Sequence, residues 1–318
     1  MIDKIKKRLL KNKLVYKLYL KRNASQRTHG KYKFISRSKD SKDLCIILAG
    51  YKGFLWDEVF YRIKKFAPPK MDVCVISSGL FSNELNEICE KNQWSYLSTK
   101  DNKVTLAQNI AVKLFPKAEN IFKLDEDILI CKNFFNGLKD SYEKIEKETR
   151  LIPGMILPIL PINGFGHIKF LEKLNLLDDF EKKFGKTYYS SSADNKIMLN
   201  VDMATYIWEK SFELDKLAAK FYEDEFNYFD CPIRISIGAI FFKRDFFEKM
   251  GMFTVDSTNG LGLDEVQICS YCLVESRPIV VCGNILAGHF CFGPQNEAMK
   301  KMYLESNMLR KLNSEDTK

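Results

Sequence analysis

Histidine is scarce in this sequence, and long apolar runs are absent. Only His29, His167 and His289 occur among the 318 residues, which nearly excludes a metal site built from several histidines. No apolar run approaches the roughly 20 residues that a transmembrane helix needs. None follows the basic N-terminus as the core of a secretory signal peptide would. The composition, 46% hydrophobic and 29% charged, instead predicts a globular chain of one large domain or two small ones.

A disulfide framework is not expected either. The cysteines number nine, an odd count, and many lie within apolar runs: Cys45, Cys74, Cys89, Cys131, Cys231, Cys269, Cys272, Cys282 and Cys291. Free buried thiols in a reducing compartment explain this pattern best. Cys269 and Cys272 lack a second cysteine pair at zinc-site spacing, so packing on a helix is favoured over a redox or metal role.

Positive charge gathers at the N-terminus. The formal net charge is +9, and the first 22 residues contain nine lysines and arginines but one acid, Asp3. Apolar residues recur there at spacings close to the helical period: Ile2, Ile5, Leu9, Leu14 and Leu18. A basic amphipathic helix of this kind predicts a peripheral segment on an anionic membrane, at its cytoplasmic face. The alternative is a solvated helix docked on its own domain.

The polar stretch 23–42 follows this helix and is interpreted as a linker. We therefore divide the chain into an arm and linker at 1–40, a main domain at 41–295 and a helical tail at 296–318. Nucleic-acid binding is not expected, because no module of stacking aromatic residues accompanies the basic charge.

Short apolar runs alternate with helical patterns in the main domain. The expected strands are Leu44–Ala49, Met71–Ile76, Trp94–Leu97, the Asn120–Ile130 stretch, Arg234–Phe242 and Pro278–Cys282. The expected helices are Trp56–Phe66, Asn83–Asn92, Leu106–Phe115, Phe170–Phe184, Met203–Phe221, Asp245–Met250 and Val266–Glu275. This alternation predicts an α/β fold with a mostly parallel central sheet flanked by helices. In such sheets, ligands bind beyond the carboxyl ends of the strands.

One acidic stretch interrupts the apolar pattern. Asn120–Ile130 reads Asn-Ile-Phe-Lys-Leu-Asp-Glu-Asp-Ile-Leu-Ile. Carboxylates are disfavoured inside strands and are costly to bury unless they are paired or bind a metal. We expect Asp125 and Asp127, which are separated by one residue, to project to the same side of the strand end. Their oxygens suit Mg²⁺ or Mn²⁺, which would also bind phosphate. A surface turn between two short strands is the alternative.

An apolar strand, Asp-Glu-Asp and a second apolar strand, in this order within an α/β chain, resemble the DxD motif of GT-A glycosyltransferases. The resemblance is one of motif order and element order, and it covers roughly Asp43 to Pro294. It implies a GT-A fold and a bacterial glycan or capsule type of enzyme in polysaccharide biosynthesis. Such an enzyme is expected to move a hexose, with inversion, from a nucleotide-sugar to a hydroxyl of a glycan or lipid-linked acceptor. A UDP-sugar is the expected donor, and Mn²⁺ or Mg²⁺ the expected cofactor.

The resemblance also implies which residues bind the donor. The loop from Ala49 through Gly50 to Tyr51 and Lys52 corresponds to the loop that holds the base and ribose in that family. Tyr51 would stack on the base and Lys52 would meet phosphate. The loop is not a Walker A sequence, and no Gly-x-Gly-x-x-Gly follows it. Asp101 falls where the family contacts nucleotide, and Asp125 and Glu126 complete the expected donor site.

Two late motifs match the same order of elements. Asp264 and Glu265 follow a glycine-rich loop at an expected helix start, where family members that invert configuration place the catalytic base. The family pattern is more often Glu-Asp, so the base is Glu265 or Asp264, with position favouring Glu265. A simple helix cap is the alternative. His289 lies where a late histidine completes the family's metal site, together with Asp125 and Asp127.

The middle of the chain is expected to meet the acceptor. Asn163, His167, Tyr188 and Trp208 are candidates for an acceptor groove, although ordinary packing or a surface loop is the favoured explanation for any one of them. A nucleotidyltransferase or another Mg²⁺-dependent nucleotide binder is the second functional hypothesis. It leaves Asp264, Glu265 and His289 without a role. A membrane adaptor would explain the basic arm but not the acidic strand end.

Overall fold

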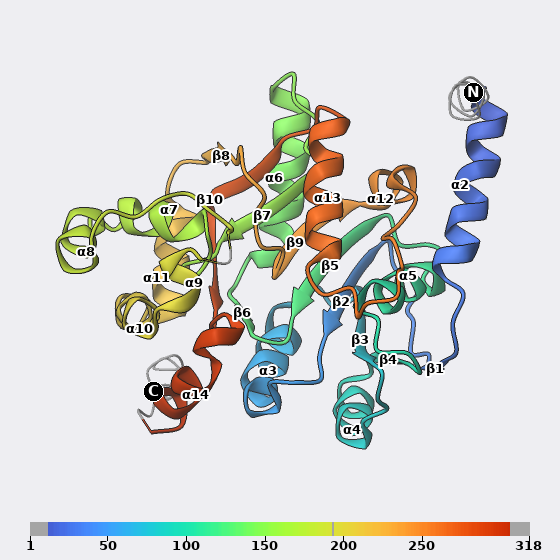
Figure 1. The fold of residues 1–318 in the computed structure, drawn as a ribbon, viewed down its shortest axis with the longest axis horizontal. Coiled ribbons are helices and arrows are strands. Elements are labelled where there is room, and N and C mark those ends of the chain that lie inside the picture. Colours follow the sequence, from blue (N-terminus) through green and yellow to red (C-terminus); the bar gives the residue numbers. More distant parts are fainter. Residues whose placement is uncertain (1–11, 193, 306–318) are drawn as a thin grey trace. The chain divides into compact units, whose positions relative to one another are not determined.

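The structure of the chain, a computed structural model, describes residues 12–192 and 194–305. The chain divides into two compact units. Unit 1 comprises Met1–Gly50, Lys70–Ile121 and Phe242–Tyr271; unit 2 comprises Tyr51–Pro69, Phe122–Phe241 and Cys272–Lys318. The chain passes between the units several times, including within strands β5 (Asn120–Asp125) and β9 (Ala239–Lys243), which are marked in Figure 1.

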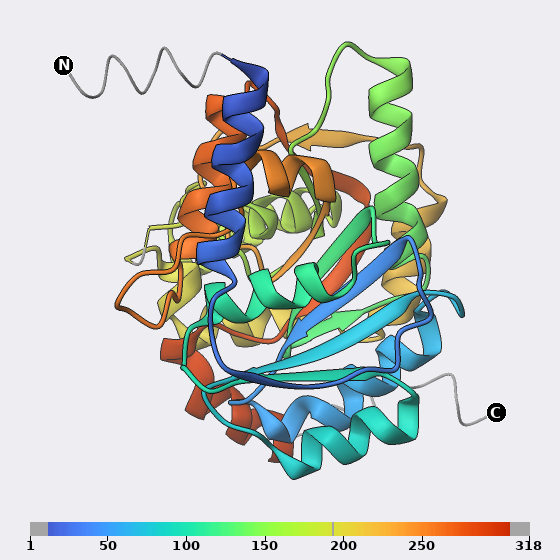
Figure 2. The same cartoon turned by 90° about the vertical axis from the view of Figure 1, so that its right-hand side faces the viewer.

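Unit 1 is built on four strands in the order β1-β4-β3-β2. They are β1 (Tyr32–Ile35), β2 (Asp43–Leu48), β3 (Asp72–Ser78) and β4 (Ser95–Thr99). β2, β3 and β4 are parallel, and β1 is antiparallel to β4. Helices α4 (Asn83–Asn92) and α5 (Val104–Leu114) cover opposite faces of these strands (Figure 2). The interior strands are buried on both faces, as their continuous apolar runs predict.

The basic helix α2 (Lys13–Arg27) docks on α12 (Arg244–Met250) of the same unit. Arg27 Nη1 donates to the carbonyl oxygens of Gly251 and Met252, each at 2.7 Å. Tyr16 Oη donates to the Lys249 carbonyl at 3.3 Å. The described part of the predicted arm therefore has a docked face, and the arm's first eleven residues lie outside the described residues.

Residues assigned to a linker are more ordered than expected. Residues 23–27 complete α2, and β1 pairs with β4 along its whole length, from Tyr32 opposite Thr99 to Ile35 opposite Tyr96. β1, Tyr-Lys-Phe-Ile, is a half-exposed edge strand. It is identified by its backbone pairing, because its sequence lacks the long apolar run from which a strand would be predicted.

Unit 2 contains a mixed set of strands in the order β5-β9-β7-β10-β6, with β8 beside β10. They include β6 (Ile128–Ile130), β7 (Met155–Ile159), β8 (Tyr228–Asp230) and β10 (Ile279–His289). β7 and β10 are parallel, whereas β6 and β8 are antiparallel to β10 and β9 is antiparallel to β7. The predicted α/β class is confirmed, but this unit has more antiparallel pairing than expected.

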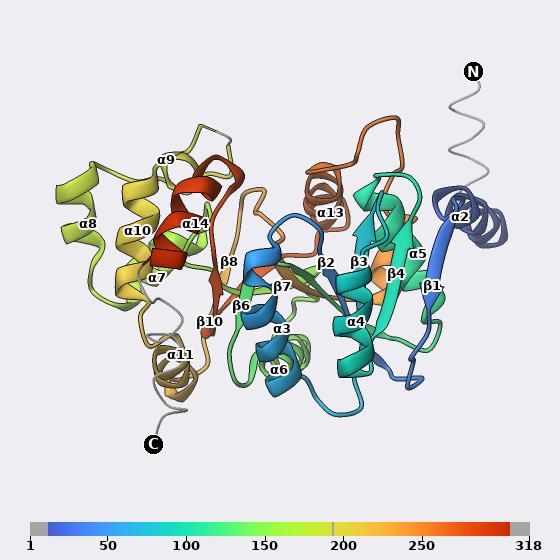
Figure 3. The same cartoon turned by 90° about the horizontal axis from the view of Figure 1, so that it is seen from below.

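Helices pack on these strands within unit 2. α6 (Phe134–Glu148) packs on β7 and β10, α11 (Leu214–Glu223) on β10, and α3 (Trp56–Phe66) on β6. α14 (Asn296–Glu305) packs against α10 (Val201–Lys210), as Figure 3 shows. The predicted tail helix is present as far as Glu305, and residues 306–318 lie outside the described residues.

The remaining elements are short or interrupted. They are η1 (Gly53–Leu55), α7 (Gly166–Lys173), α8 (Leu177–Phe184), α9 (Lys196–Leu199), η2 (Gly293–Gln295) and α13 (Leu263–Val274), which begins in unit 1. The helix expected over Phe170–Phe184 is divided between α7 and α8, because Asn175 adopts a left-handed φ of 57°. The helix expected over Met203–Phe221 is likewise divided at Glu213, with φ 60°.

A buried arginine joins three elements of unit 2. Arg62 on α3 is 1% exposed, and its Nε donates to Glu58 at 2.6 Å. Its Nη1 donates to the Ile130 carbonyl at 3.1 Å and to Asp215 at 2.8 Å. Removing one member would leave a buried charge unpaired, so this cluster fixes α3 against β6 and α11.

Two further predictions concern cysteines and membranes. All nine cysteines are buried and free, which confirms the interpretation against a disulfide framework. Among residues 12–192 and 194–305, every helix is too short or too polar to span a bilayer.

Candidate functional site

The acidic stretch turns sharply where β5 ends. Asp125 is the last residue of β5, Glu126 and Asp127 form a turn, and β6 begins at Ile128. The Asp125 N–H donates to the Gly238 carbonyl at 2.8 Å, whereas the Asp127 carbonyl accepts from the Phe290 N–H at 3.0 Å. The two aspartates therefore join different neighbours. They do not project together from one straight strand as expected, because the turn changes the direction of the chain between them.

Glu126 fixes the start of the loop that contains Tyr51. One carboxylate oxygen accepts from the Tyr51 N–H at 2.8 Å, and the other accepts from Trp56 Nε1 at 2.6 Å. Both protein donors are on the segment that leads into α3. Glu126 therefore holds this loop, and the ligand contact implied by the resemblance stays a prediction.

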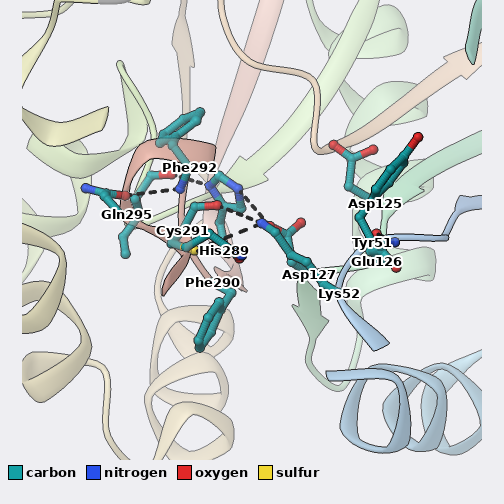
Figure 4. A network of polar contacts seen from close by, with 12 residues as sticks. Tyr51, Lys52, Asp125, Glu126, Asp127, His289, Phe290, Cys291, Phe292 and Gln295 are labelled. Atoms are coloured by element: carbon teal, nitrogen blue, oxygen red, sulfur yellow. Dashed lines mark hydrogen bonds and ion pairs between the residues drawn. The ribbon is translucent and has the colours of Figure 1, made fainter. Parts of the chain in front are cut away.

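Asp127 lies between a lysine and a histidine. The Lys52 ammonium forms a short ion pair with Asp127 Oδ2 and donates to the Cys291 carbonyl at 3.1 Å. His289 Nε2 lies 3.5 Å from the same carboxylate oxygen. Figure 4 shows these side chains converging on Asp127 from the loop before α3 and from the end of β10. The Asp127 side chain is only 5% exposed.

The electrostatics of this group favour a charged pair. Burial acts to raise the pKa of the Asp127 carboxyl, but His289 and Lys52 outweigh it and hold that pKa well below its usual range. Burial acts to lower the pKa of Lys52, but the neighbouring Asp127 carboxylate outweighs it and raises that pKa above its usual value. At neutral pH, the aspartate is therefore anionic and the lysine cationic.

His289 is oriented by a backbone oxygen. Its Nδ1 lies at hydrogen-bond distance from the Ile162 carbonyl, and its Nε2 lies 3.5 Å from Asp127 Oδ2. Both oxygens can only accept, so each ring nitrogen faces an acceptor. The ring also packs edge-on against Phe292, with centroids 4.8 Å apart. His289 is thus held in one orientation beside the buried carboxylate.

The predicted metal ligands do not form a metal site in this arrangement. Asp125 Oδ1 pairs with Lys123 Nζ at 2.6 Å, and Asp127 pairs with Lys52. Over residues 12–192 and 194–305, no three His, Cys, Asp or Glu side chains are grouped so as to hold a metal ion. The side chains as placed do not fit Mn²⁺ or Mg²⁺. That the protein uses Mn²⁺ or Mg²⁺ stays a prediction from the sequence.

The predicted donor loop divides between the units. Ala49 is buried in unit 1. Its N–H donates to the Ile76 carbonyl of β3 at 2.9 Å, so this amide continues the pairing of β2 with β3. Gly50 has a φ of 158°, a backbone conformation that L side chains rarely adopt, so this position favours glycine. Tyr51 in unit 2 is 76% exposed. Asp101 is an exposed loop residue of unit 1 whose carbonyl accepts from Thr99 Oγ1 at 2.9 Å.

The two candidates for the catalytic base have different surroundings. Asp264 is 5% exposed, and its oxygens accept from Gln108 Nε2 at 2.8 Å and from the Glu265 N–H at 2.9 Å. It therefore holds the start of α13, as in the helix-cap alternative. Glu265 is half-buried on the same helix. Both belong to unit 1, whereas Lys52, Asp127 and His289 belong to unit 2.

Three of the four acceptor candidates are packing residues. Asn163, His167 and Trp208 are at most 2% exposed, and Trp208 Nε1 donates to the Phe290 carbonyl at 2.8 Å. That bond supports the chain directly after His289. Tyr188, in contrast, is 62% exposed. Of the four, Tyr188 alone presents a large surface to a ligand.

The sequence interpretation missed Lys123 and Cys291. Lys123 is a lysine inside an apolar strand, 2% exposed, and lies two residues before Asp125 on the same face. That placement is a signal, because a buried lysine needs a carboxylate partner. Cys291 contributes its backbone carbonyl to Lys52, and a backbone contact leaves no mark in the sequence.

Comparisons with known proteins give structural but not sequence matches. No protein-family model matches the sequence, and no curated protein matches it. The structure is similar to crystal structures of S. aureus TarS. One match has 16% identity over 38% of this chain and 22% of that chain, with a TM-score of 0.32. TarS 1–349 in complex with UDP-GlcNAc gives 20% identity over 38% and 34%, with a TM-score of 0.31.

A second crystal structure of TarS 1–349 gives a longer match. It has 14% identity over 85% of this chain and 66% of that chain, with a TM-score of 0.41. In each comparison, the match covers less than two thirds of the TarS chain. With TM-scores between 0.31 and 0.41, these matches do not assign a function to the present chain.

Proposed function

We propose that the protein is a glycosyltransferase that takes a sugar from a nucleotide-sugar, with a UDP-sugar as donor, and transfers it to a hydroxyl group. The supporting observation is the buried Asp127 carboxylate, held between Lys52 and His289 at the turn after β5. A charged group costs free energy to bury, and such groups gather where a ligand is bound. Ligands of α/β sheets bind beyond the carboxyl ends of strands, and β5 ends here.

Two adjacent residues suit the two parts of a nucleoside diphosphate. Tyr51 exposes 76% of its surface, and its backbone is fixed by Glu126 at 2.8 Å. An exposed aromatic ring on a fixed backbone is a stacking platform for a base, worth about 1–3 kcal/mol per base. Lys52 follows at once and carries an ammonium group for the diphosphate.

The chain's own groups then account for transfer. The acceptor oxygen forms a bond to the anomeric carbon of the sugar as the bond from that carbon to the diphosphate oxygen breaks. The ammonium of Lys52 stabilises the negative charge that grows on the departing diphosphate. A carboxylate takes the acceptor proton. Glu265 is the proposed base, because it occupies the position at the start of α13 that the resemblance favours. This scheme inverts the anomeric carbon.

The proposed acceptor is a glycan or a lipid-linked sugar at the inner face of the membrane. α2 docks through one face. Its opposite face exposes Leu14 at 68% and Leu18 at 59%, and Lys21 is also exposed. Apolar side chains among lysines suit the headgroup region of an anionic bilayer. The helix would hold the enzyme peripherally beside such an acceptor.

A nucleotidyltransferase is the alternative function. It would also place charged groups around a nucleotide, but it would release pyrophosphate from a nucleoside triphosphate rather than a nucleoside diphosphate from a nucleotide-sugar. Product identity therefore separates the two proposals.

The proposal is tested by thermal unfolding in the presence of nucleoside diphosphates and nucleotide-sugars. A ligand at about 100 times its Kd stabilises the folded chain by about 2.7 kcal/mol, so UDP or a UDP-sugar should raise the Tm. Tyr51→Ala should reduce this rise, whereas Tyr61→Ala, which alters a tyrosine 43% exposed on α3, should not. A Tm that responds to none of the nucleotides would contradict the proposal.

A further inference from the structure

We propose that the Lys52 ammonium takes the place of a divalent metal ion at the donor diphosphate, so that donor binding requires no metal. This inference rests on the proposed function and specifies how its donor site works. It departs from the expectation, drawn from the sequence, that Asp125, Asp127 and His289 hold Mn²⁺ or Mg²⁺.

The first observation is that each aspartate of the acidic turn already has its own cation. Asp127 pairs with Lys52, and Asp125 pairs with Lys123 at 2.6 Å. Lys123 is itself fixed, since it also donates to the Ile237 carbonyl at 2.9 Å and its side chain is 3% exposed. Glu126, the third carboxylate of the turn, has no lysine of its own among these pairs, but its two oxygens already accept from the Tyr51 N–H and Trp56 Nε1. A divalent ion needs several anionic oxygens that can turn toward it, and each carboxylate here already holds a donor.

The second observation is the position of the ammonium. Lys52 is held by Asp127 and by the Cys291 carbonyl at 3.1 Å, while its side chain remains 16% exposed. An ammonium has three N–H donors. In the described part of the chain, these two oxygens accept from it, and Cys291 Sγ, at 4.0 Å, is a weak acceptor. A phosphate oxygen can therefore replace the weak Cys291 Sγ acceptor without breaking the ion pair.

The third observation is that a metal ion would have to displace this lysine. An ion bound to Asp127 Oδ2 would lie beside the ammonium that already contacts the same oxygen. Like charges at such short separations repel strongly in a poorly hydrated site. His289, at 3.5 Å from that oxygen, fixes the carboxylate from another side. The geometry thus holds the lysine in place as a permanent positive charge.

The test is calorimetric titration of UDP into the full chain, first with EDTA and then with Mn²⁺. We expect UDP to bind in EDTA, with an affinity that Mn²⁺ changes by less than about threefold, because the resident ammonium carries the electrostatic role. Lys52→Met should weaken binding in EDTA by about tenfold or more, since a charged hydrogen bond to phosphate is lost. Lys52→Arg should retain more affinity than Lys52→Met.

Lys182→Met is the matched control, because Lys182 is a lysine 77% exposed on α8 of the same unit. It should bind UDP like the unaltered chain. UDP binding that requires Mn²⁺, or a Lys52→Met chain that is folded and binds normally in EDTA, would overturn the inference and leave the proposed function standing. No binding of UDP or of any other nucleoside diphosphate in either condition would overturn both.

Discussion

The Lys52 ammonium and the Asp127 carboxylate form an ion pair across 75 positions of sequence, with side chains 16% and 5% exposed. This pair joins the loop before α3 to the turn after β5. Its polar partners, the Cys291 carbonyl and His289, come from the end of β10 and the residues just beyond it. The chain therefore brings three separate segments of unit 2 together around one buried carboxylate.

Asp127 is expected to position Lys52. Asp127→Asn removes the charge that holds the ammonium, so UDP affinity should fall by about tenfold and stability by about 2 kcal/mol. Calorimetric titration and urea unfolding measure the two effects. Asp125→Asn is the control, because Asp125 pairs with Lys123 and is 37% exposed. If Asp125→Asn weakened UDP binding as much as Asp127→Asn does, the distinction between the two aspartates would be wrong.

Glu265 and Asp264 should respond differently to removal of their charge. Glu265→Gln should lower turnover by about 10²–10⁴-fold with UDP affinity unchanged, as loss of a general base does. Asp264→Asn should lower stability by about 1–2 kcal/mol, because it weakens the bond from Gln108 and the start of α13. Steady-state kinetics and urea unfolding test this pair. A Glu265→Gln enzyme with full turnover, or a product that retains the donor's anomeric configuration, would exclude Glu265 as the base.

The outward face of α2 should bind anionic vesicles. Each basic residue near such a surface contributes about 1 kcal/mol, and added salt screens it. The full chain should sediment with phosphatidylserine vesicles at low salt and less at high salt. Leu14→Ser with Leu18→Ser should weaken this binding while the docked face, with Arg27 on Gly251 and Met252, is unchanged. Failure of the unaltered chain to sediment at low salt would rule out the membrane role.

Stability should depend on pH through His167. Burial lowers the pKa of His167 to about 4 from an ordinary value of 6.5, and the ring contacts the Asn163 carbonyl and Thr187 Oγ1, each at 2.7 Å. Between these two pKa values, the unfolded chain binds a proton that the folded chain excludes. The free energy of unfolding should therefore decrease as pH falls through this window, by up to about 3 kcal/mol.

Urea unfolding as a function of pH measures this effect. His167→Gln, which cannot be protonated, should flatten the dependence over that window, and His29→Gln, which alters an exposed histidine, should not. An unchanged pH dependence in His167→Gln would show that other groups cause it.

Local signals in the sequence predicted several elements well. The helix expected over Asn83–Asn92 matches α4, and that over Trp56–Phe66 matches α3. Ser82 accepts from the Leu85 N–H at 3.2 Å at the start of α4, and Gln93 ends it with a left-handed φ of 57°. In both helices, the pattern of apolar residues and the residues at the ends agree, so the sequence contains the needed information.

The partners of the site residues were not predictable in the same way. The turn at Glu126 separates Asp125 from Asp127, and nothing in three adjacent acids specifies whether the chain stays extended. β10 extends to His289, well past the expected end at Cys282, because it pairs with β7, β8 and β6. Such pairings join residues far apart in the chain. The sequence suggested Lys52 and Asp127 separately, and only the fold shows that they meet.

The central claim, glycosyl transfer from a nucleotide-sugar, is tested most directly by the products that the full chain releases. Nucleotide-sugars are supplied with a hydroxyl acceptor, and nucleoside triphosphates with sugar phosphates are supplied in parallel. The account predicts release of a nucleoside diphosphate from a UDP-sugar, falling by about 10²-fold in Lys52→Met, in which the charge on the departing diphosphate is no longer stabilised. Release of pyrophosphate from the triphosphates, with no diphosphate released from any nucleotide-sugar, would contradict it.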